Sequence, residues 1–285
     1  ARYSTARVGG PVRWFAAASS AAELAADARF LWKTGVPFRI LGNGSNIIVS
    51  DFGWQGMMLY NQAKEMRIDR SGSQPQLFAE SGATLAAVVR LTVDEGLSGF
   101  EWAAGIPGTI GGAVYGNAGA RGQDTQQILA LANILHRESG ELSLTSTEMD
   151  YRYRSSKFKR EAEQVVILSA AFNLSESTPA QVKAYVEELN AKRRGSQPAG
   201  ASTGSTFKNP EGDFAGRLIE AAGLKGTKVG GVQVSPVHAN FFVNDGTATA
   251  KDYYQLIQLV QKTVKQQFSV ALELEIELLG DWQDD

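Results

Sequence analysis

Residues 102–120 constrain the fold more strongly than any other stretch of this sequence. The segment is 19 residues long, has no charged side chain, and contains six glycines together with Pro107 and Asn117. Because glycine and proline destabilise helices, the segment does not predict a membrane-spanning helix in spite of its lack of charge. Glycines at this density suit a backbone that lies close to something large and flat, or whose N–H groups face an anion. A tightly packed turn without a ligand is the alternative.

A second glycine loop, Gly42-Asn43-Gly44-Ser45-Asn46, lies between two apolar runs, 37–41 and 47–50, that predict strands. It lacks the third glycine of the G-x-G-x-x-G motif and no helix follows it directly, so it does not predict a Rossmann unit. In the first stretch, 107–109 predicts the start of a helical turn whose N–H groups face an anion. Two loops of this kind in the first 120 residues favour a dinucleotide held by loops.

The overall composition is that of a globular chain with about two domains. Of the 285 residues 43% are hydrophobic and 20% are charged, and the net charge of −2 argues against a nucleic-acid partner. The absence of cysteine excludes disulfides and thiolate metal sites, and with only two histidines we expect no metal centre. The N-terminal residues show no apolar core of a secretory signal, so we expect a cytoplasmic protein.

Hydrophobic periodicity and capping residues predict mixed helix and strand. Helices are expected over 19–34, 84–95, 178–195, 213–222 and 250–267, and strands at 37–41 and 47–50, within 130–172 and 228–243, and at 270–279. Ser20 and Glu23 are expected to form a capping box at the start of the first helix. A change in composition near 172–178 predicts a domain boundary.

Two further motifs place charged side chains together. Residues 152–160 contain five basic side chains, which suit either a solvated face or a site for a carboxylate or phosphate. In the last predicted strand, apolar residues alternate with Glu273, Glu275 and Glu277, so three carboxylates share one face and periodicity cannot choose among them. The sequence 200–204 matches G-x-S-x-G, but a loop precedes it and a proline follows, so it does not predict a hydrolase nucleophile.

Taken in order, these segments resemble the UDP-N-acetylenolpyruvoylglucosamine reductase family over nearly the whole chain. The matching pieces are 5–11, 42–46, 105–112, 117–119, 153–156, 204–210, 230–231 and 238–240. The resemblance implies an α+β fold with a two-lobed FAD-binding domain of the vanillyl-alcohol-oxidase type at 1–172, with lobes at about 1–60 and 61–172. A smaller α+β substrate-binding domain would follow at 173–285.

The resemblance also implies a reaction. NADPH would reduce bound FAD, and the reduced flavin would give hydride to the enolpyruvyl group of UDP-N-acetylglucosamine enolpyruvate, forming UDP-N-acetylmuramate for peptidoglycan. We therefore expect a small-molecule substrate, neither nucleic acid nor membrane as a partner, and a monomer. The FAD contacts implied are Gly42, Asn43, Gly44, Ser45, Asn46, Pro107, Gly108, Thr109, Gly111, Gly112, Asn117 and Gly119.

Three catalytic residues follow from the resemblance. Arg154 would neutralise the charge that develops on the substrate carboxylate. Ser205 would protonate the adjacent carbon, and Glu275 would share a proton with the carboxylate or polarise it. Substrate contacts are implied for Tyr153, Asn209 and His238.

The chain departs from the family pattern at two positions of the last predicted strand. Leu274 stands where the family commonly has proline, and Glu277 stands where it often has a basic residue, so the choice between Glu273 and Glu275 stays open.

The spacing between two of the implied catalytic residues indicates a branch of the family. Only 51 positions separate Arg154 from Ser205 (205 − 154), so the chain resembles the branch that lacks a substrate-capping tyrosine loop. Arg193 and Arg194 are candidates to cover the sugar diphosphate. Another FAD oxidase or dehydrogenase of this fold, or a flavin or nucleotide-sugar binding module without turnover, are the alternative functions.

Overall fold

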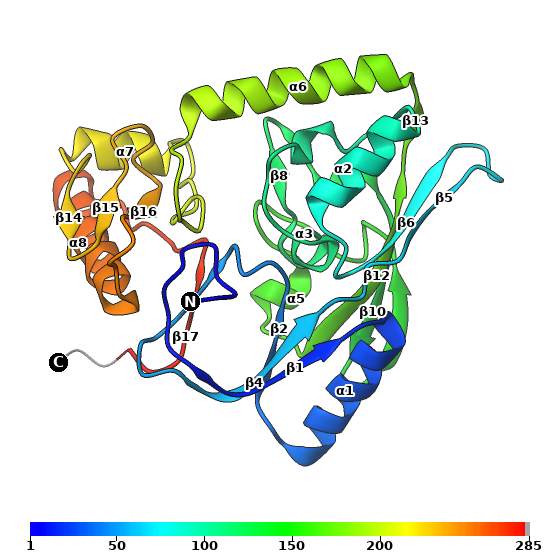
Figure 1. Ribbon diagram of the computed structural model, residues 1–285, viewed down its shortest axis with the longest axis horizontal. Helices are drawn as coiled ribbons and strands as arrows, with labels where there is room; N and C mark the ends of the chain where they lie inside the picture. Colours follow the sequence, from blue (N-terminus) through cyan, green and yellow to red (C-terminus); the bar gives the residue numbers. More distant parts are fainter. Residues whose placement is uncertain (283–285) are drawn as a thin grey trace. The chain divides into compact units, whose positions relative to one another are not determined.

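The computed structural model describes residues 1–282, and the chain forms two compact units (Figure 1). Unit 1 comprises Ala1–Trp14, Asn43–Gln55 and Arg193–Asp285, and unit 2 comprises Phe15–Gly42 and Gly56–Lys192. Both units mix helix and strand, which confirms the predicted α+β class.

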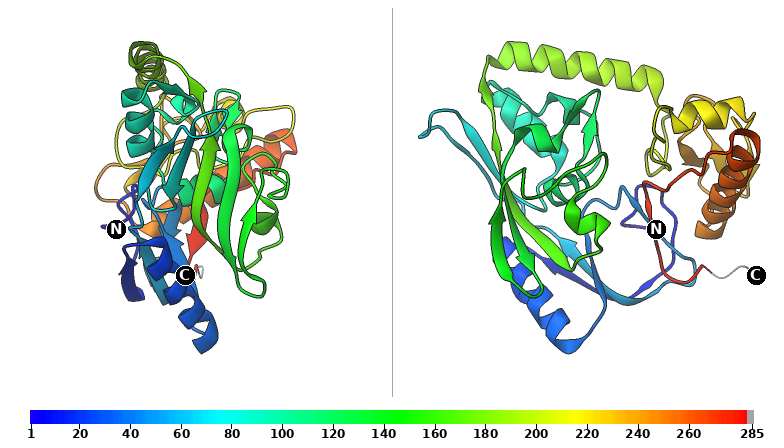
Figure 2. Two further views of the ribbon diagram at one scale, coloured as in Figure 1. Left: turned by 90° about the vertical axis from the view of Figure 1, so that its right-hand side faces the viewer. Right: turned by 180° about the vertical axis from the view of Figure 1, so that it is seen from behind.

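Unit 2 is built on a five-stranded antiparallel sheet. Its strands follow the order β11 (Gly140–Leu144), β10 (Leu129–His136), β12 (Val165–Asn173), β6 (Gln76–Glu80) and β5 (Met66–Asp69). Figures 1 and 2 show α2 (Leu85–Asp94) and α3 (Ile110–Gly116) on one side of this sheet. Successive residues of β12 enter different cores, because Ile167 packs with α2 and α3 whereas Val166 and Leu168 pack with α1 (Ala21–Thr34).

A smaller sheet with the order β1 (Val12–Ala18), β4 (Trp54–Asn61) and β2 (Phe38–Leu41) contributes to the core that α1 covers. The predicted first helix is confirmed, since Ser20 accepts the Glu23 N–H at 3.2 Å and Gly35 ends the helix in a left-handed conformation. The predicted capping box is wrong in its second half. The Glu23 carboxylate accepts from the N–H and hydroxyl of Ser19, at 2.7 and 2.6 Å, rather than from the Ser20 N–H.

Short connecting elements complete unit 2. They are β7 (Leu97–Ser98), the 3-10 helix η1 (Glu101–Ala103), β8 (Gly119–Ala120), β9 (Gln123–Asp124), α4 (Thr125–Ile128), α5 (Lys157–Arg160) and β13 (Ser175–Glu176). The predicted helix after Thr178 is α6 (Pro179–Ser196), whose first 14 residues, 179–192, belong to this unit.

Unit 1 contains a three-stranded sheet of β14 (Lys228–Val229), β15 (Val232–Val234) and β16 (Phe242–Asn244). It packs on α7 (Ala215–Ala221) and α8 (Ala250–Phe268). These two helices confirm the helices predicted at 213–222 and 250–267. The N-terminal residues Ala6 and Val8 are buried in this core. Unit 1 is therefore discontinuous because its core needs residues from both ends of the chain.

The last predicted strand, 270–279, is wrong in extent. Only β17 (Glu277–Leu279) forms a regular strand, in parallel with β3 (Ile47–Val49). Leu274 instead makes an isolated bridge to Phe207. The segment changes pairing partner along its length, so it is extended without being one continuous strand.

The compact units divide the chain differently from the predicted domains at 1–172 and 173–285. Residues 1–14 and 43–55 belong with the C-terminal unit, and most of α6 belongs with unit 2. Parallel pairing of β3 with β17 explains the inclusion of 43–55 in unit 1. The assignment of FAD binding to 1–172 and of substrate binding to 173–285 stays a prediction.

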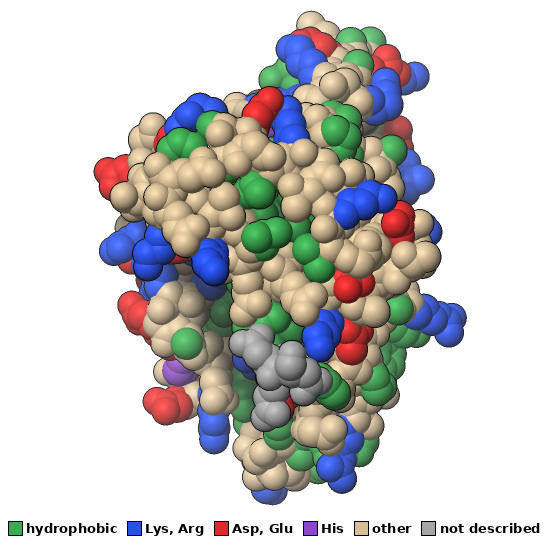
Figure 3. All heavy atoms as spheres, turned by 90° about the vertical axis from the view of Figure 1, so that its left-hand side faces the viewer, with side chains coloured by type: hydrophobic (Ala, Val, Ile, Leu, Met, Phe, Trp, Pro, Cys, Tyr) green, Lys and Arg blue, Asp and Glu red, His purple; other side chains and the backbone are tan. Residues whose placement is uncertain are grey.

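Basic and acidic side chains are interspersed with uncharged surface on the face drawn in Figure 3, in keeping with the small net charge. Within residues 1–282, no helix combines the length and apolar character needed to cross a membrane.

Candidate active site

In unit 2 the two predicted glycine loops meet at Gly42 and Thr109. A Cβ atom on Gly42 would lie 2.6 Å from the Thr109 hydroxyl oxygen, so only glycine fits there. Thr109 also begins α3, accepting the Gly112 N–H at 3.5 Å, and Gly108 before it has φ +157°. The structure thus brings together two segments, 67 positions apart (109 − 42), that the sequence indicated for one dinucleotide.

The rest of α3 is fixed to its surroundings by backbone contacts. Gly111 donates its N–H to the Ser81 carbonyl at 2.7 Å, and a Cβ on Gly111 would lie 3.0 Å from the Ser81 Cβ. Asn117 ends the helix in a left-handed conformation, and its amide nitrogen bonds Asp124 at 3.1 Å and the Arg152 carbonyl at 3.3 Å. The Asn117 side chain therefore holds the loop, and a cofactor contact there would come from its backbone.

Arg154 lies in a tight turn of unit 2. The turn is closed by paired backbone bonds between Arg152 and Ser155, at 2.8 and 3.1 Å, and Arg154 has φ +55°, an uncommon conformation for a residue with a side chain. Two hydroxyls tie the turn to α3. Tyr151 donates to the Val114 carbonyl at 2.8 Å, and Ser156 donates to the next carbonyl along the helix at 2.7 Å.

The neighbour of Arg154 in this turn is the predicted substrate contact Tyr153. Its ring is exposed and lies under the Arg154 guanidinium, 5.4 Å from ring centroid to Cζ. The turn thus presents an aromatic face and a cation together, a combination that suits a ligand carrying both a carboxylate and a flat group.

In unit 1, three of the sequence-predicted residues line one cavity. Ser205, Asn209 and His238 border a cavity of about 420 Å³, together with Phe214, Gly216, Arg217, Glu220, Val237, Ala239 and Asn240. Asn209 is held by accepting the Ala215 N–H at 3.1 Å, at the start of α7. The cavity therefore presents a hydroxyl, an amide and an imidazole that come from two distant parts of the sequence.

Several residues of this cavity were not predicted from the sequence. Phe214, Arg217 and Glu220 recur every three residues and line the cavity from α7 and the residue before it. The sequence predicts only a helix at 213–222 for this region. Arg217 forms an ion pair with Asp213.

The three glutamates near the C-terminus occupy different environments in unit 1. Glu273 and Glu277 are exposed, whereas Glu275 is half-buried. Glu273 pairs with the Lys208 ammonium at 3.2 Å. Glu275 instead donates its backbone N–H to the Thr206 carbonyl at 2.9 Å, beside the predicted acid Ser205. Glu275 is thus the half-buried glutamate next to the segment that carries Ser205, and its catalytic role stays a prediction.

The remaining residues of the first glycine loop lie in unit 1. Gly44 accepts the Thr5 N–H at 3.0 Å, and a Cβ on Gly44 would overlap the Tyr3 carbonyl. Asn46 donates its side-chain amide to the Glu275 carbonyl at 3.0 Å. Ser45 lies between these two anchors, and Asn43 directly precedes the first. The loop is thus linked directly to the segment that carries the candidate glutamate.

Comparisons with known proteins match both parts of the chain. The FAD binding domain family matches residues 12–142, and the C-terminal domain family of UDP-N-acetylenolpyruvoylglucosamine reductase matches 197–279. A reductase of this name from Chloroflexus aggregans is 40% identical over 281 residues, covering 98% of this chain and 95% of the relative. One from Chlamydia pneumoniae is 41% identical over 282 residues, covering 98% and 89%. The chain belongs to the UDP-N-acetylenolpyruvoylglucosamine reductase family.

A solved structure supports the same assignment. The UDP-N-acetylenolpyruvylglucosamine reductase of Thermus caldophilus superimposes with a TM-score of 0.82 at 33% identity, covering 98% of this chain and 96% of that one. This likeness and the FAD-binding match confirm the predicted fold of a vanillyl-alcohol-oxidase-type FAD-binding domain followed by a substrate domain. The cofactor of this family member is FAD, as predicted.

The residues of the glycine loops fit a flavin dinucleotide. Gly42 and Gly111 keep their backbones within contact distance of Thr109 and Ser81, where side chains would intrude. Where glycines leave the backbone uncovered, its N–H groups suit a diphosphate, although the Gly111 N–H is already bonded to the Ser81 carbonyl at 2.7 Å. In unit 2, Gly42 and residues 107–119 are the ones that the sequence predicts for this contact, and their roles stay predictions. Among residues 1–282, no cluster of three or more His, Asp or Glu could hold a metal ion.

Replacing Gly42 with alanine should weaken FAD binding. The added Cβ would lie 2.6 Å from the Thr109 hydroxyl oxygen, which forces the two loops apart. Overpacking of this kind costs about 1–3 kcal/mol of folding stability. Because the displaced loops no longer match the cofactor, we expect FAD to bind about tenfold more weakly or worse. The measurement is the flavin-to-protein ratio after desalting. Gly195→Ala is the matched control, because a Cβ there meets nothing within 4 Å. Full FAD retention by Gly42→Ala would contradict a role of the contact between Gly42 and Thr109 in FAD binding.

His238 should titrate below the ordinary histidine range. Burial lowers the pKa of its imidazole below the usual 6.5, and its Nδ1 accepts the Asn240 N–H at 3.3 Å, which requires a neutral ring nitrogen. The stability that this arrangement contributes is complete above pH 6.5 and is lost as the pH falls through the lowered pKa.

Proton NMR can test this directly, because the chain has only two histidines, His136 and His238. We expect one C2-proton resonance to titrate below 6.5, to vanish in His238→Gln and to persist in His136→Gln. A His238 resonance that titrates at or above 6.5 would contradict the expectation.

Proposed function

We propose that this protein reduces the enolpyruvyl group of UDP-N-acetylglucosamine enolpyruvate to form UDP-N-acetylmuramate, with NADPH as the reductant. Family membership over 98% of the chain supports the reaction. The observation that carries the assignment of residues is the cavity of unit 1, where Ser205, Asn209 and His238 come together. The sequence predicts substrate chemistry for all three residues.

FAD, when bound, supplies the two-electron chemistry that passes reducing equivalents from NADPH to the substrate. Reduction of the enolpyruvyl double bond pushes negative charge into the adjacent carboxylate. Arg154 neutralises this charge, and the hydroxyls of Tyr151 and Ser156 anchor the turn that carries it to α3. Tyr153 packs beside the same guanidinium and contacts the substrate.

The other proposed roles belong to unit 1. Ser205 gives its hydroxyl proton to the carbon next to the carboxylate, since an enolate-like carbon is basic enough to take a proton from an alcohol. Glu275 shares a proton with the carboxylate or polarises it. Asn209 and His238 bind the substrate from the cavity wall as neutral hydrogen-bonding groups.

We further propose that the protein acts as a monomer in the cytoplasm, without nucleic acid or membrane as a partner. The consumption of NADPH supports the compartment. The mixed charge and the net charge of −2 support the expectation of a small anionic substrate rather than a polyanion.

Substrate-dependent NADPH oxidation tests the proposal. Purified protein should carry FAD, and NADPH absorbance should fall continuously only when the enolpyruvyl sugar nucleotide is present. Flavin reduction by a hydroxy acid or an alcohol without NADPH would instead identify another FAD oxidase or dehydrogenase. Binding of the sugar nucleotide without any turnover would identify a binding module.

A further inference from the structure

The predicted acid Ser205 begins a short extended segment, 205–208, that lies between two others in unit 1. On one side Glu275 donates its N–H to the Thr206 carbonyl at 2.9 Å. On the other side the partner is Asn240, which is 3% exposed. The backbone of Thr206, the residue after Ser205, is therefore held from both sides.

Asn240 uses its backbone and both side-chain functions on this segment. Its carbonyl accepts the Thr206 N–H at 2.8 Å. Its Oδ1 accepts the Phe207 N–H at 3.0 Å, and its Nδ2 donates to the Phe207 carbonyl at 2.8 Å. The Asn240 carboxamide therefore bonds both the N–H and the carbonyl of Phe207, as the backbone of a neighbouring strand would do.

The same asparagine also reaches the cavity wall. Its backbone N–H donates to His238 Nδ1 at 3.3 Å, and Asn240 itself lines the cavity with Ser205. The buried Asn240 thus contacts both the segment that carries Ser205 and the imidazole of His238.

We propose that Asn240 is a positioning residue for Ser205. Its carboxamide fixes the backbone from Ser205 to Phe207 so that the Ser205 hydroxyl faces the substrate carbon that it protonates. The inference rests on the proposed function, since it concerns the proton transfer of that reaction. A displacement of about 1 Å at a reacting group can cost roughly 10²-fold in rate, so the loss of two side-chain bonds should be visible in kinetics.

Asn240→Leu keeps the side-chain size and removes both carboxamide bonds. We expect the rate at which substrate reoxidises the reduced flavin to fall by about 10²-fold. Reduction of the flavin by NADPH should be unchanged, and kcat should fall more than KM for the sugar nucleotide changes. Rapid-mixing absorbance measurements separate the two half-reactions. A general loss of structure would slow both.

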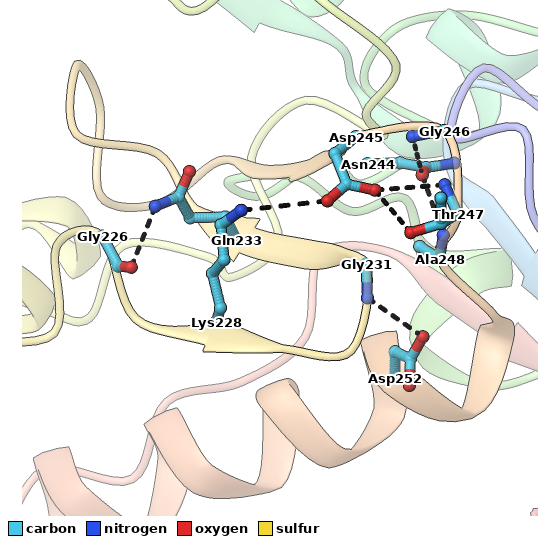
Figure 4. A network of polar contacts seen from close by, with 10 residues as sticks. All are labelled: Gly226, Lys228, Gly231, Gln233, Asn244, Asp245, Gly246, Thr247, Ala248 and Asp252. Atoms are coloured by element: carbon cyan, nitrogen blue, oxygen red, sulfur yellow. Dashed lines mark hydrogen bonds and ion pairs between the residues drawn. The ribbon is translucent and has the colours of Figure 1, made fainter.

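Asn244 offers a matched control in the same unit (Figure 4). It is also a buried asparagine with three side-chain bonds: Oδ1 accepts the N–H groups of Gly246 and Ala248, at 2.7 and 3.2 Å, and Nδ2 donates to the Ala6 carbonyl at 2.9 Å. Asn244→Leu should lower the melting temperature at least as much as Asn240→Leu while leaving both half-reactions unchanged.

Two more variants keep the test decisive. Asn240→Asp retains the acceptor for the Phe207 N–H and loses the donor, so it should slow the substrate half-reaction by less than Asn240→Leu does, even if the leucine variant folds poorly. In a Ser205→Ala background, Asn240→Leu should add less than about a twofold effect, because residues that act as a unit are not additive.

Two results would overturn the inference. One is a substrate half-reaction in Asn240→Leu no slower than in Asn244→Leu, and the other is an undiminished Asn240→Leu effect in the Ser205→Ala background. Failure of the wild-type protein to turn over the sugar nucleotide would overturn the proposed function itself. An active wild type with an unaffected Asn240→Leu variant would overturn only this inference.

Discussion

Ser205→Ala should reduce its flavin with NADPH as fast as the wild-type protein but transfer those electrons to the enolpyruvyl substrate about 10²–10⁴ times more slowly. Ser205 lines the unit 1 cavity with Asn209 and His238, where we propose that the substrate binds. Its proposed task begins only after NADPH has reacted. The first half-reaction should therefore proceed normally, and the reduced flavin should accumulate when substrate is added.

Ser202→Ala is the matched control for this variant. Ser202 lies three positions earlier in the same loop, and its hydroxyl accepts the Gly204 N–H at 3.4 Å without lining the cavity. We expect both half-reactions of Ser202→Ala to match the wild type. Equal losses in the two variants would mean that the loop, and not the Ser205 proton, limits the rate.

The sequence predicts best the helices, whose capping and apolar residues lie close together in the chain. The sequence predicts the limits of α1, α2 and α8 to within two residues, because capping side chains and apolar spacing lie within each segment. The final strand was overextended because its partners are remote. The Glu275 carbonyl bonds Asn46, 229 positions away, and no local pattern encodes that contact.

The candidate site shows the same limit. Gly42 and Thr109 were predicted for one ligand from their chemistry, yet only the structure shows that they touch. The carboxamide of Asn240 could not be distinguished from an ordinary buried asparagine, because its role depends on facing the backbone of Phe207, 33 positions earlier. Residue types indicate what a site can do, whereas the choice among similar residues requires the pairing of distant segments.

A comparison of Glu275→Gln with Glu273→Gln shows which of the two carboxyl groups takes part in catalysis. The alternation of apolar residues and glutamates in the sequence cannot decide this. Glutamine preserves the shape of the side chain but cannot share a proton with the substrate carboxylate. Because Glu275 is half-buried and its backbone bonds the residue after Ser205, we expect Glu275→Gln to slow the substrate half-reaction by about 10²-fold or more while FAD content and reduction by NADPH stay unchanged.

Glu273→Gln removes only an exposed carboxylate and its contact with the Lys208 ammonium at 3.2 Å. A pair of this kind contributes about 1 kcal/mol or less to stability, so both half-reactions should stay within about twofold of the wild type. Stopped-flow traces of flavin reduction and reoxidation give both rates for each variant. A larger loss in Glu273→Gln would assign the catalytic role to the exposed carboxylate, and equal small losses would remove a carboxyl from the mechanism. The half-burial of Glu275, beside the segment that carries Ser205, is the physical reason to expect neither result.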